Sequence, residues 1–233
     1  DVYKRQGVMS VLKSFVDTYE TADGRTIQSL SVSEREAYEK DPYHGARDPR
    51  MNVSIFTPGD NTGFSNYTFN PFNPDCGDYI GRNDGIRSGY MMKKFMTEDD
   101  RGNNGNGSLD FVIYRYAEVL LDYVECLIET GHWNDPKVKE YIDAIRVRGG
   151  MPRMDETVYN SEEKVRELYR RERRVELCFE GKRYDDIRRW GIGNDVMNGP
   201  IPNAKIDTVP KAPPENKSRK PIILFPCAMF ANT

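Results

Sequence analysis

Hydrophobic and polar positions alternate at helical spacing in the second half of the chain. Over residues 113–128 apolar side chains recur every three or four residues, and charged side chains fill much of the remaining surface. Gly131 ends this predicted helix, and Pro136 begins a second one that closes at Gly150. Because the connection is short, the pattern predicts an antiparallel pair of helices.

A third helix is predicted between Asn160 and Gly181, where the apolar periodicity is strongest. Asn160 with Glu163 three residues later is a helix-start signal. Gly181 is a stop signal, because glycine adopts the left-handed closing conformation at little cost. We expect this helix to pack on the antiparallel pair.

The apolar stripe of the third helix also contains two glutamates, Glu172 and Glu176, one turn apart. Buried carboxylates are costly unless cations pair with them, so we expect arginines of the partner helices and of the following segment to approach them. The predicted structural ion network consists of Arg115, Arg146, Glu172, Glu176, Arg183 and Arg188.

Outside this helical core, predicted over residues 110–191, the chain is rich in Gly, Asn, Pro and Asp. Residues 1–109 are predicted to be a loop-rich segment with short helices and strands, including extended pieces over 51–56 and 90–95. Residues 192–233 are predicted to be a loop-rich tail. Long loop regions commonly carry function, so the first segment is expected to face a ligand.

Composition excludes several classes of protein. The formal charge of -3 over 233 residues gives no general attraction to nucleic acid, and the basic run of the third helix is nearly balanced by acids. Four cysteines without a CxxC pair argue against a zinc ribbon, and Cys126 and Cys178 are expected to be core residues. No nucleic-acid partner is expected.

No motif for a catalytic centre, a cofactor or a metal is present. His44 and His132 stand beside no nucleophile motif, and HExxH, Walker A and GxGxxG patterns are absent. Residues 99–110 have the composition of a calcium loop without its alternation of ligands. The glutamates of the third helix could be offered as the acid and base of a glycosidase, but a structural role is favoured. We expect no cofactor.

A sugar site needs aromatic rings for stacking and amides for the hydroxyl groups, and residues 60–75 interleave both. The alternative is an aromatic-stapled surface loop, and for Trp133 a cap over the helix pair. The candidate ligand-binding residues are Phe64, Asn66, Tyr67, Phe69, Asn70, Phe72 and Trp133.

Five segments in order resemble the SusD/RagB family. The sequence ERRVELCFEGKRYDDIRRW at residues 172–190 is similar to the family's C-terminal signature. YRYAEVLLDYVECLIETG at 114–131 and IDAIRVRGGMP at 142–152 resemble its helix and the following Arg-Gly segment. ARDPRMNVSIFTPG at 46–59 and SGYMMKKF at 88–95 resemble its Asp-Pro-Arg and Gly-Tyr-Lys-Lys pieces.

The resemblance implies a mainly α fold: a SusD-like helical fold with tetratricopeptide-like helix pairs, long irregular loops and a few short strands. It implies a lipoprotein on the outer surface of the cell outer membrane that captures oligosaccharide, or sometimes peptide, for a SusC-like TonB-dependent transporter, without catalysis. It also implies that this chain is a C-terminal fragment, with the lipid anchor and the N-terminal repeats outside it. The alternatives are a helical-repeat scaffold for another protein and a glycoside hydrolase.

Overall fold

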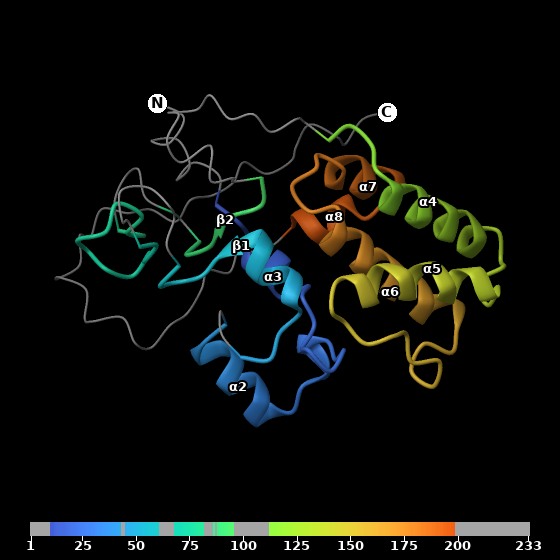
Figure 1. Ribbon diagram of the computed structural model, residues 1–233, viewed down its shortest axis with the longest axis horizontal. Coiled ribbons are helices and arrows are strands. Elements are labelled where there is room, and N and C mark those ends of the chain that lie inside the picture. The colour runs from blue at the N-terminus through green and yellow to red at the C-terminus, as the bar shows by residue number, and fades with distance from the viewer. Residues whose placement is uncertain are drawn as a thin grey trace.

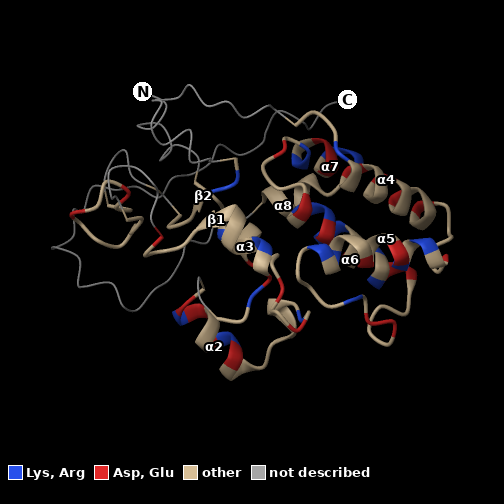
Figure 2. Ribbon diagram, viewed as in Figure 1, with Lys and Arg blue, Asp and Glu red and all other residues tan. Residues whose placement is uncertain are grey.

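The computed structural model describes residues 10–42, 45–60, 68–81, 86, 88–95 and 112–198. Within them the chain is mainly helical, as predicted, and its two strands are short (Figure 1). Helices α4 to α7 gather on one side of the molecule, whereas α2, α3 and the strands lie on the other. Acidic and basic residues are interspersed along α4, α5, α6 and α7 (Figure 2).

Three helices form the main packing unit. Helix α4 spans Tyr116–Glu129, α5 spans Pro136–Arg148 and α6 spans Glu162–Glu176. Helix α5 begins at Pro136 because the Asp135 side chain caps it by accepting from the Lys137 N–H at 2.9 Å. Helix α4 packs against both other helices, and α5 packs against α6. The predicted antiparallel pair is thereby confirmed.

The apolar stripes of these helices meet in one buried cluster. Each fully buried aliphatic side chain contributes about 1.5–3 kcal/mol relative to exposure, so the cluster is the main source of stability for this unit. Its buried members include Leu121, Val124, Ile128, Val138, Ile142, Ile145, Val165 and Leu168.

Helix α6 is shorter than predicted at both ends. Its first turn is capped by Ser161, not Asn160, and it ends at Glu176 rather than at Gly181. The carbonyl oxygen of Glu176 accepts instead from the Arg115 and Lys94 side chains, at 2.7 and 3.2 Å. These side chains satisfy a group that the next helical turn would otherwise have bonded.

After α6 the chain turns before two short helices. Phe179 adopts a left-handed backbone conformation with φ of 64°, which is uncommon for a residue with a side chain. Helix α7, Arg183–Arg189, and helix α8, Gly193–Met197, follow.

The first half of the described chain contains short elements. They are α1 (Lys13–Val16), the 3-10 turn η2 (Ile27–Ser29), α2 (Val32–Lys40), α3 (Pro49–Ser54), β1 (Ile55–Phe56) and β2 (Met91–Met92). The two strands pair antiparallel, with Ile55 opposite Met92. The extended piece predicted over 51–56 is wrong for its first four residues, because the Asp48 side chain caps the helix that Pro49 begins.

A second buried cluster joins this half to α6. Phe15, Tyr19 and Met51 pack with Val175 and Cys178, all of them buried. The core position expected for Cys178 is confirmed. The core position expected for Cys126 is wrong, since this residue lies on the exposed face of α4. Helical periodicity alone does not show how wide the buried stripe of a helix is.

Candidate functional site

Glu172 connects three distant parts of the chain. This α6 residue is 1% exposed, and its carboxylate accepts from Arg50 of α3 at 2.9 Å and from Arg146 of α5. Arg146 also donates to Glu20 at 2.8 Å, and Arg50 donates to Asp48 at 2.7 Å. Every charge in this group is buried, and each carboxylate faces a guanidinium.

One turn further along, Glu176 continues the same network. Its carboxylate pairs with Arg115 at 2.6 Å and with Arg148. Arg115 also donates to Glu180 at 2.8 Å, and Lys94 donates to Glu180 at 2.6 Å. We call the connected set the ion lattice. It consists of Glu20, Asp48, Arg50, Lys94, Arg115, Arg146, Arg148, Arg171, Glu172, Glu176 and Glu180.

The structure places four of the six predicted network residues, Arg115, Arg146, Glu172 and Glu176, in the ion lattice. Arg183 and Arg188 lie outside it, and neither forms an ion pair with any described residue. Instead the Arg183 guanidinium lies 5.8 Å from the Trp190 ring centre, and that of Arg188 lies 5.5 Å from Tyr184.

The carboxylates of the ion lattice are unsuited to glycosidase chemistry. A general acid needs a raised pKa and an open approach to the sugar. Burial acts to raise the pKa of Glu180, but hydrogen bonds from Arg115 and Lys94 outweigh it and leave the pKa below its ordinary value. The carboxylate oxygens of Glu172 and Glu176 accept hydrogen bonds from arginines. The lattice therefore acts as an ionic cross-link.

The predicted sugar contacts are scattered. Phe69 is fully buried against Phe56, with ring centres 6.0 Å apart, so as placed it has no exposed face for a sugar. The Asn70 side chain accepts from the Phe72 N–H at 3.1 Å, which makes it a turn-former. Phe72 and Trp133 are half-buried, each against a core cluster. Phe64, Asn66 and Tyr67 lie outside the described residues.

The base of that loop is nevertheless well defined. Gly59 donates its N–H to the Phe69 carbonyl and Phe69 donates to the Asp60 carbonyl, both at 2.9 Å. The Asp60 carboxylate in turn accepts from Lys93 at 3.1 Å. Asp60 and Phe69 are therefore held together at one anchored point next to Lys93, which follows β2.

In the described part of the chain no three His, Cys, Asp or Glu side chains gather as metal ligands would. No helix there has the length and apolar composition needed to cross a bilayer. His132 is exposed, with Nδ1 3.1 Å from the Thr130 hydroxyl, whereas His44 and residues 99–110 lie outside the described residues.

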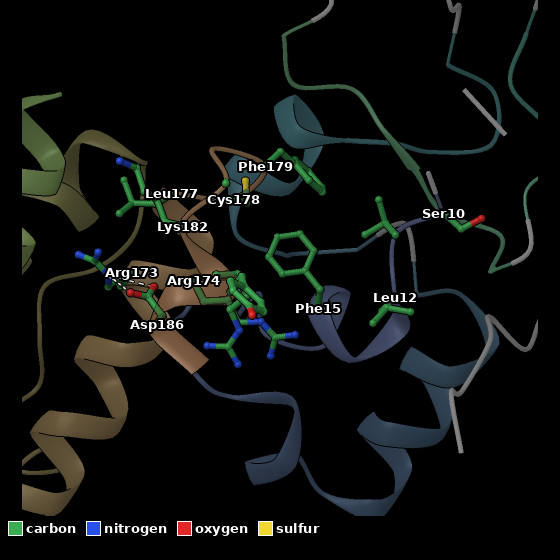
Figure 3. A pocket seen from close by; sticks show the side chains of 14 residues that line it. Ser10, Leu12, Phe15, Arg173, Arg174, Leu177, Cys178, Phe179, Lys182 and Asp186 are labelled. Atoms are coloured by element: carbon green, nitrogen blue, oxygen red, sulfur yellow. Dashed lines mark hydrogen bonds and ion pairs between the residues drawn. The ribbon is translucent and has the colours of Figure 1, made fainter. Parts of the chain in front are cut away.

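Two cavities open beside α6, on opposite sides of its last turn. The arginine cavity, of about 490 Å³, is bordered by Leu12, Phe15, Arg174, Leu177, Phe179 and Arg183, among others (Figure 3). The lattice cavity, of about 460 Å³, is bordered by ion-lattice residues together with Lys93 and Phe95. Both volumes are in the range of small-ligand sites.

Comparison with known proteins identifies the family. A model of the SusD family matches residues 3–226. A SusD-like protein from Formosa agariphila, named P2, is 32% identical over 126 residues, which are 51% of this chain and 25% of that protein. The chain therefore spans about a quarter of that curated relative.

Solved structures agree with this assignment. A SusD-like carbohydrate-binding protein from Bacteroides fragilis is 31% identical, with a TM-score of 0.63 over 83% of this chain and 37% of that one. A second SusD-like protein from the same species is 28% identical, with a TM-score of 0.64 over 80% and 37% of the two chains. The chain belongs to the SusD family.

Proposed function

We propose that this chain is part of a glycan-binding protein of an outer-membrane uptake system, which captures oligosaccharide and passes it to a SusC-like TonB-dependent transporter without cleaving it. The observation that carries the proposal is the 31% identity, over 83% of the chain, to a structure described as a SusD-like carbohydrate-binding protein. Surface exposure and a lipid anchor outside this chain are part of the same proposal.

The loop over residues 60–75 is proposed as a sugar-contacting element. Its base is held by backbone hydrogen bonds between residues 59, 60 and 69 and by the Lys93–Asp60 ion pair at 3.1 Å. A loop on a fixed base presents its side chains at lower entropic cost than a free one. Phe64, Asn66, Tyr67 and Phe72 are the proposed contacts, and Trp133 is a weaker candidate.

A non-catalytic role fits the chemistry of the described carboxylates. Glu176 and Glu180 border the lattice cavity together, but both carboxylates are bound by arginine or lysine, whereas hydrolysis requires one carboxyl group that can hold and donate a proton. Capture followed by transfer needs only reversible binding.

Calorimetry of the purified protein against a panel of neutral oligosaccharides tests the proposal. Tyr67→Ala is expected to weaken binding of the best ligand by about tenfold or more, since a stacked ring is lost. Phe69→Ala serves as the contrast, because loss of a fully buried ring should lower the melting temperature. Tyr116→Ala, at a position of α4 that is 74% exposed, should change neither. Cleavage of a glycan, or binding of peptides alone, would contradict the proposal.

A scaffold for another protein is the second candidate, favoured by one observation. Ile113, Tyr116, Val119 and Tyr123 are exposed along α4 and the residues before it, at 78%, 74%, 42% and 46%. Apolar side chains gathered in this way often mark a protein-binding surface. Co-purification with a partner other than a porin-like transporter, together with no saccharide binding, would favour the scaffold.

A further inference from the structure

The arginine cavity lies between the segment that leads into α1 and the turn that follows α6 (Figure 3). Phe15 and Phe179 meet edge to face on its apolar side, with ring centres 5.5 Å apart, and Leu177 adds to that side. An apolar wall of this kind can bind the C–H face of a cyclic ligand, because burying that face removes apolar surface from water.

Two guanidinium groups border the same cavity, and each lies near an aromatic ring rather than a carboxylate of the described residues. Within the described residues, neither Arg174 nor Arg183 forms a hydrogen bond or an ion pair, although both are half-buried. The Arg174 guanidinium lies 5.6 Å from the Phe15 ring centre. The third arginine that lines this cavity, Arg173, is bound by the carboxylates of Asp122 and Asp186.

The electrostatic environment of these two groups is unfavourable for cations. Burial and the positive charge of Arg183 together lower the pKa of Arg174 to about 10, although Asp17 and Tyr19 act to raise it. Burial also lowers the pKa of Arg183; Asp186 opposes this shift by electrostatic attraction, and Arg170 adds to it. Both groups remain charged at neutral pH, so the cavity carries two adjacent positive charges that a bound anion would neutralise.

Carboxylates of the protein that lie nearby already have other partners. Asp186 accepts from Arg173 at 3.0 Å, and Asp17 accepts from Lys13 at 2.9 Å. Asp17 attracts Arg174 electrostatically without coming within ion-pair distance. The charge of Arg174 is therefore not matched by the described part of the chain.

We propose that the arginine cavity binds the carboxylate of an acidic sugar, a uronic acid within an oligosaccharide. Guanidinium groups match the planar carboxylate, and the ring of the sugar would lie against Phe15 and Phe179. A phosphate fits less well, because it carries nearly two charges and loses more hydration beside apolar walls. The inference deepens the proposed glycan-binding function and rests on it.

The lattice cavity provides an internal contrast. Its cations Arg50, Lys94, Arg115 and Arg148 each face a glutamate, so an entering carboxylate would compete with Glu176 and Glu180. The preference for acidic sugars is therefore assigned to the arginine cavity.

Calorimetry with digalacturonate and with its methyl ester tests the inference, because the two ligands differ in charge and share the same rings. The acid is expected to bind at least about tenfold more tightly than the ester at low salt. Arg174→Gln and Arg183→Gln should each remove most of that preference and leave binding of the ester unchanged. Arg188→Gln is the matched control, since Arg188 is exposed on α7 and makes no described ion pair. Arg174→Lys, which keeps the charge but loses the planar fork, should retain part of the preference.

The outcomes separate this inference from the proposed function. Equal affinity for acid and ester, with neutral oligosaccharides still bound, overturns the inference alone. Loss of folding stability in Arg174→Gln without any change in acid preference also overturns it, because a carboxylate of the polypeptide would then be the partner. Failure to bind any saccharide overturns both.

Discussion

Arg173 and Arg174 are neighbours in α6, yet they meet opposite environments. Arg173 is 5% exposed and binds Asp186 of α7 at 3.0 Å and Asp122 of α4 at 2.7 Å. Arg174 points to the arginine cavity and has no such partner within the described residues. The sequence of α6 does not distinguish the two. What distinguishes them is which acidic side chains the surrounding elements bring to each face of the helix.

The same contrast holds for the two sides of the last turn of α6. On the lattice side, each carboxylate and each guanidinium is paired, and removal of one member takes a counter-charge from every partner that it binds. On the cavity side, two cations lack partners, so removal of one leaves no buried charge unpaired. The two sides should therefore respond very differently to substitution.

The largest effect is expected on the lattice side. Glu172→Ala takes from Arg50 and Arg146 the carboxylate that they share, and Glu176→Ala takes one of the two glutamates that Arg115 binds. Each substitution is expected to lower the free energy of unfolding by about 3–5 kcal/mol, as for a broken buried pair. Chemical denaturation monitored by circular dichroism measures it.

Glu167→Ala is the control for this prediction, because Glu167 is exposed on the same helix and should change the free energy of unfolding by less than about 0.5 kcal/mol. A melting temperature that Glu176→Ala leaves unchanged would refute the description of the lattice as a structural cross-link.

A smaller effect is expected from acid. The pKa of Glu180 is lowered in the folded state, and so is that of Glu125, where burial acts upward but hydrogen bonds from Arg189 and Tyr169 outweigh it. A group with a lowered folded pKa stabilises the protein above its unfolded pKa, near 4.5 for glutamate, and loses that contribution as the pH falls. The stability should therefore decline below about pH 4.5.

Glu180→Gln tests this pH dependence. The variant should be less stable than the parent at pH 7, and its free energy of unfolding should fall less steeply between about pH 5 and 3. Urea denaturation at each pH measures this free energy. Because glutamine keeps the size of glutamate and one acceptor oxygen, whereas alanine removes both, the difference should be smaller than that caused by Glu176→Ala. An unchanged slope would mean that Glu180 titrates alike in the folded and unfolded states.

Local signals explain what the sequence predicts well. The helix pair follows from apolar periodicity, from Asp135-Pro136 at a helix start and from the glycines at its end, all of which act over a few residues. The need of Glu172 and Glu176 for cationic partners also follows from their position in an apolar stripe. These predictions needed no knowledge of distant contacts.

Non-local contacts explain what the sequence missed. Arg50 is 122 positions from the Glu172 that it binds, and no local pattern relates the two. The sequence places Arg183 and Arg188 in the predicted network only because both are close to Glu172 and Glu176 along the chain. The chain, however, leaves α6 at Glu176 and turns at Phe179, which directs α7 elsewhere. Phe69 was proposed to bind sugar because composition alone cannot tell a core ring from an exposed one.

The smallest effect is expected on the cavity side. Arg174→Met keeps the length and apolar stem of the side chain and removes a half-buried cation that has no described partner, so the free energy of unfolding should change by less than about 1 kcal/mol. Arg146→Met is the matched comparison, because it removes a buried cation that Glu20 and Glu172 share and should cost about 3–5 kcal/mol. Urea denaturation of both variants measures the difference. Equal losses would show that Arg174 is as firmly paired as Arg146, and the distinction between the two sides of α6 would then fail.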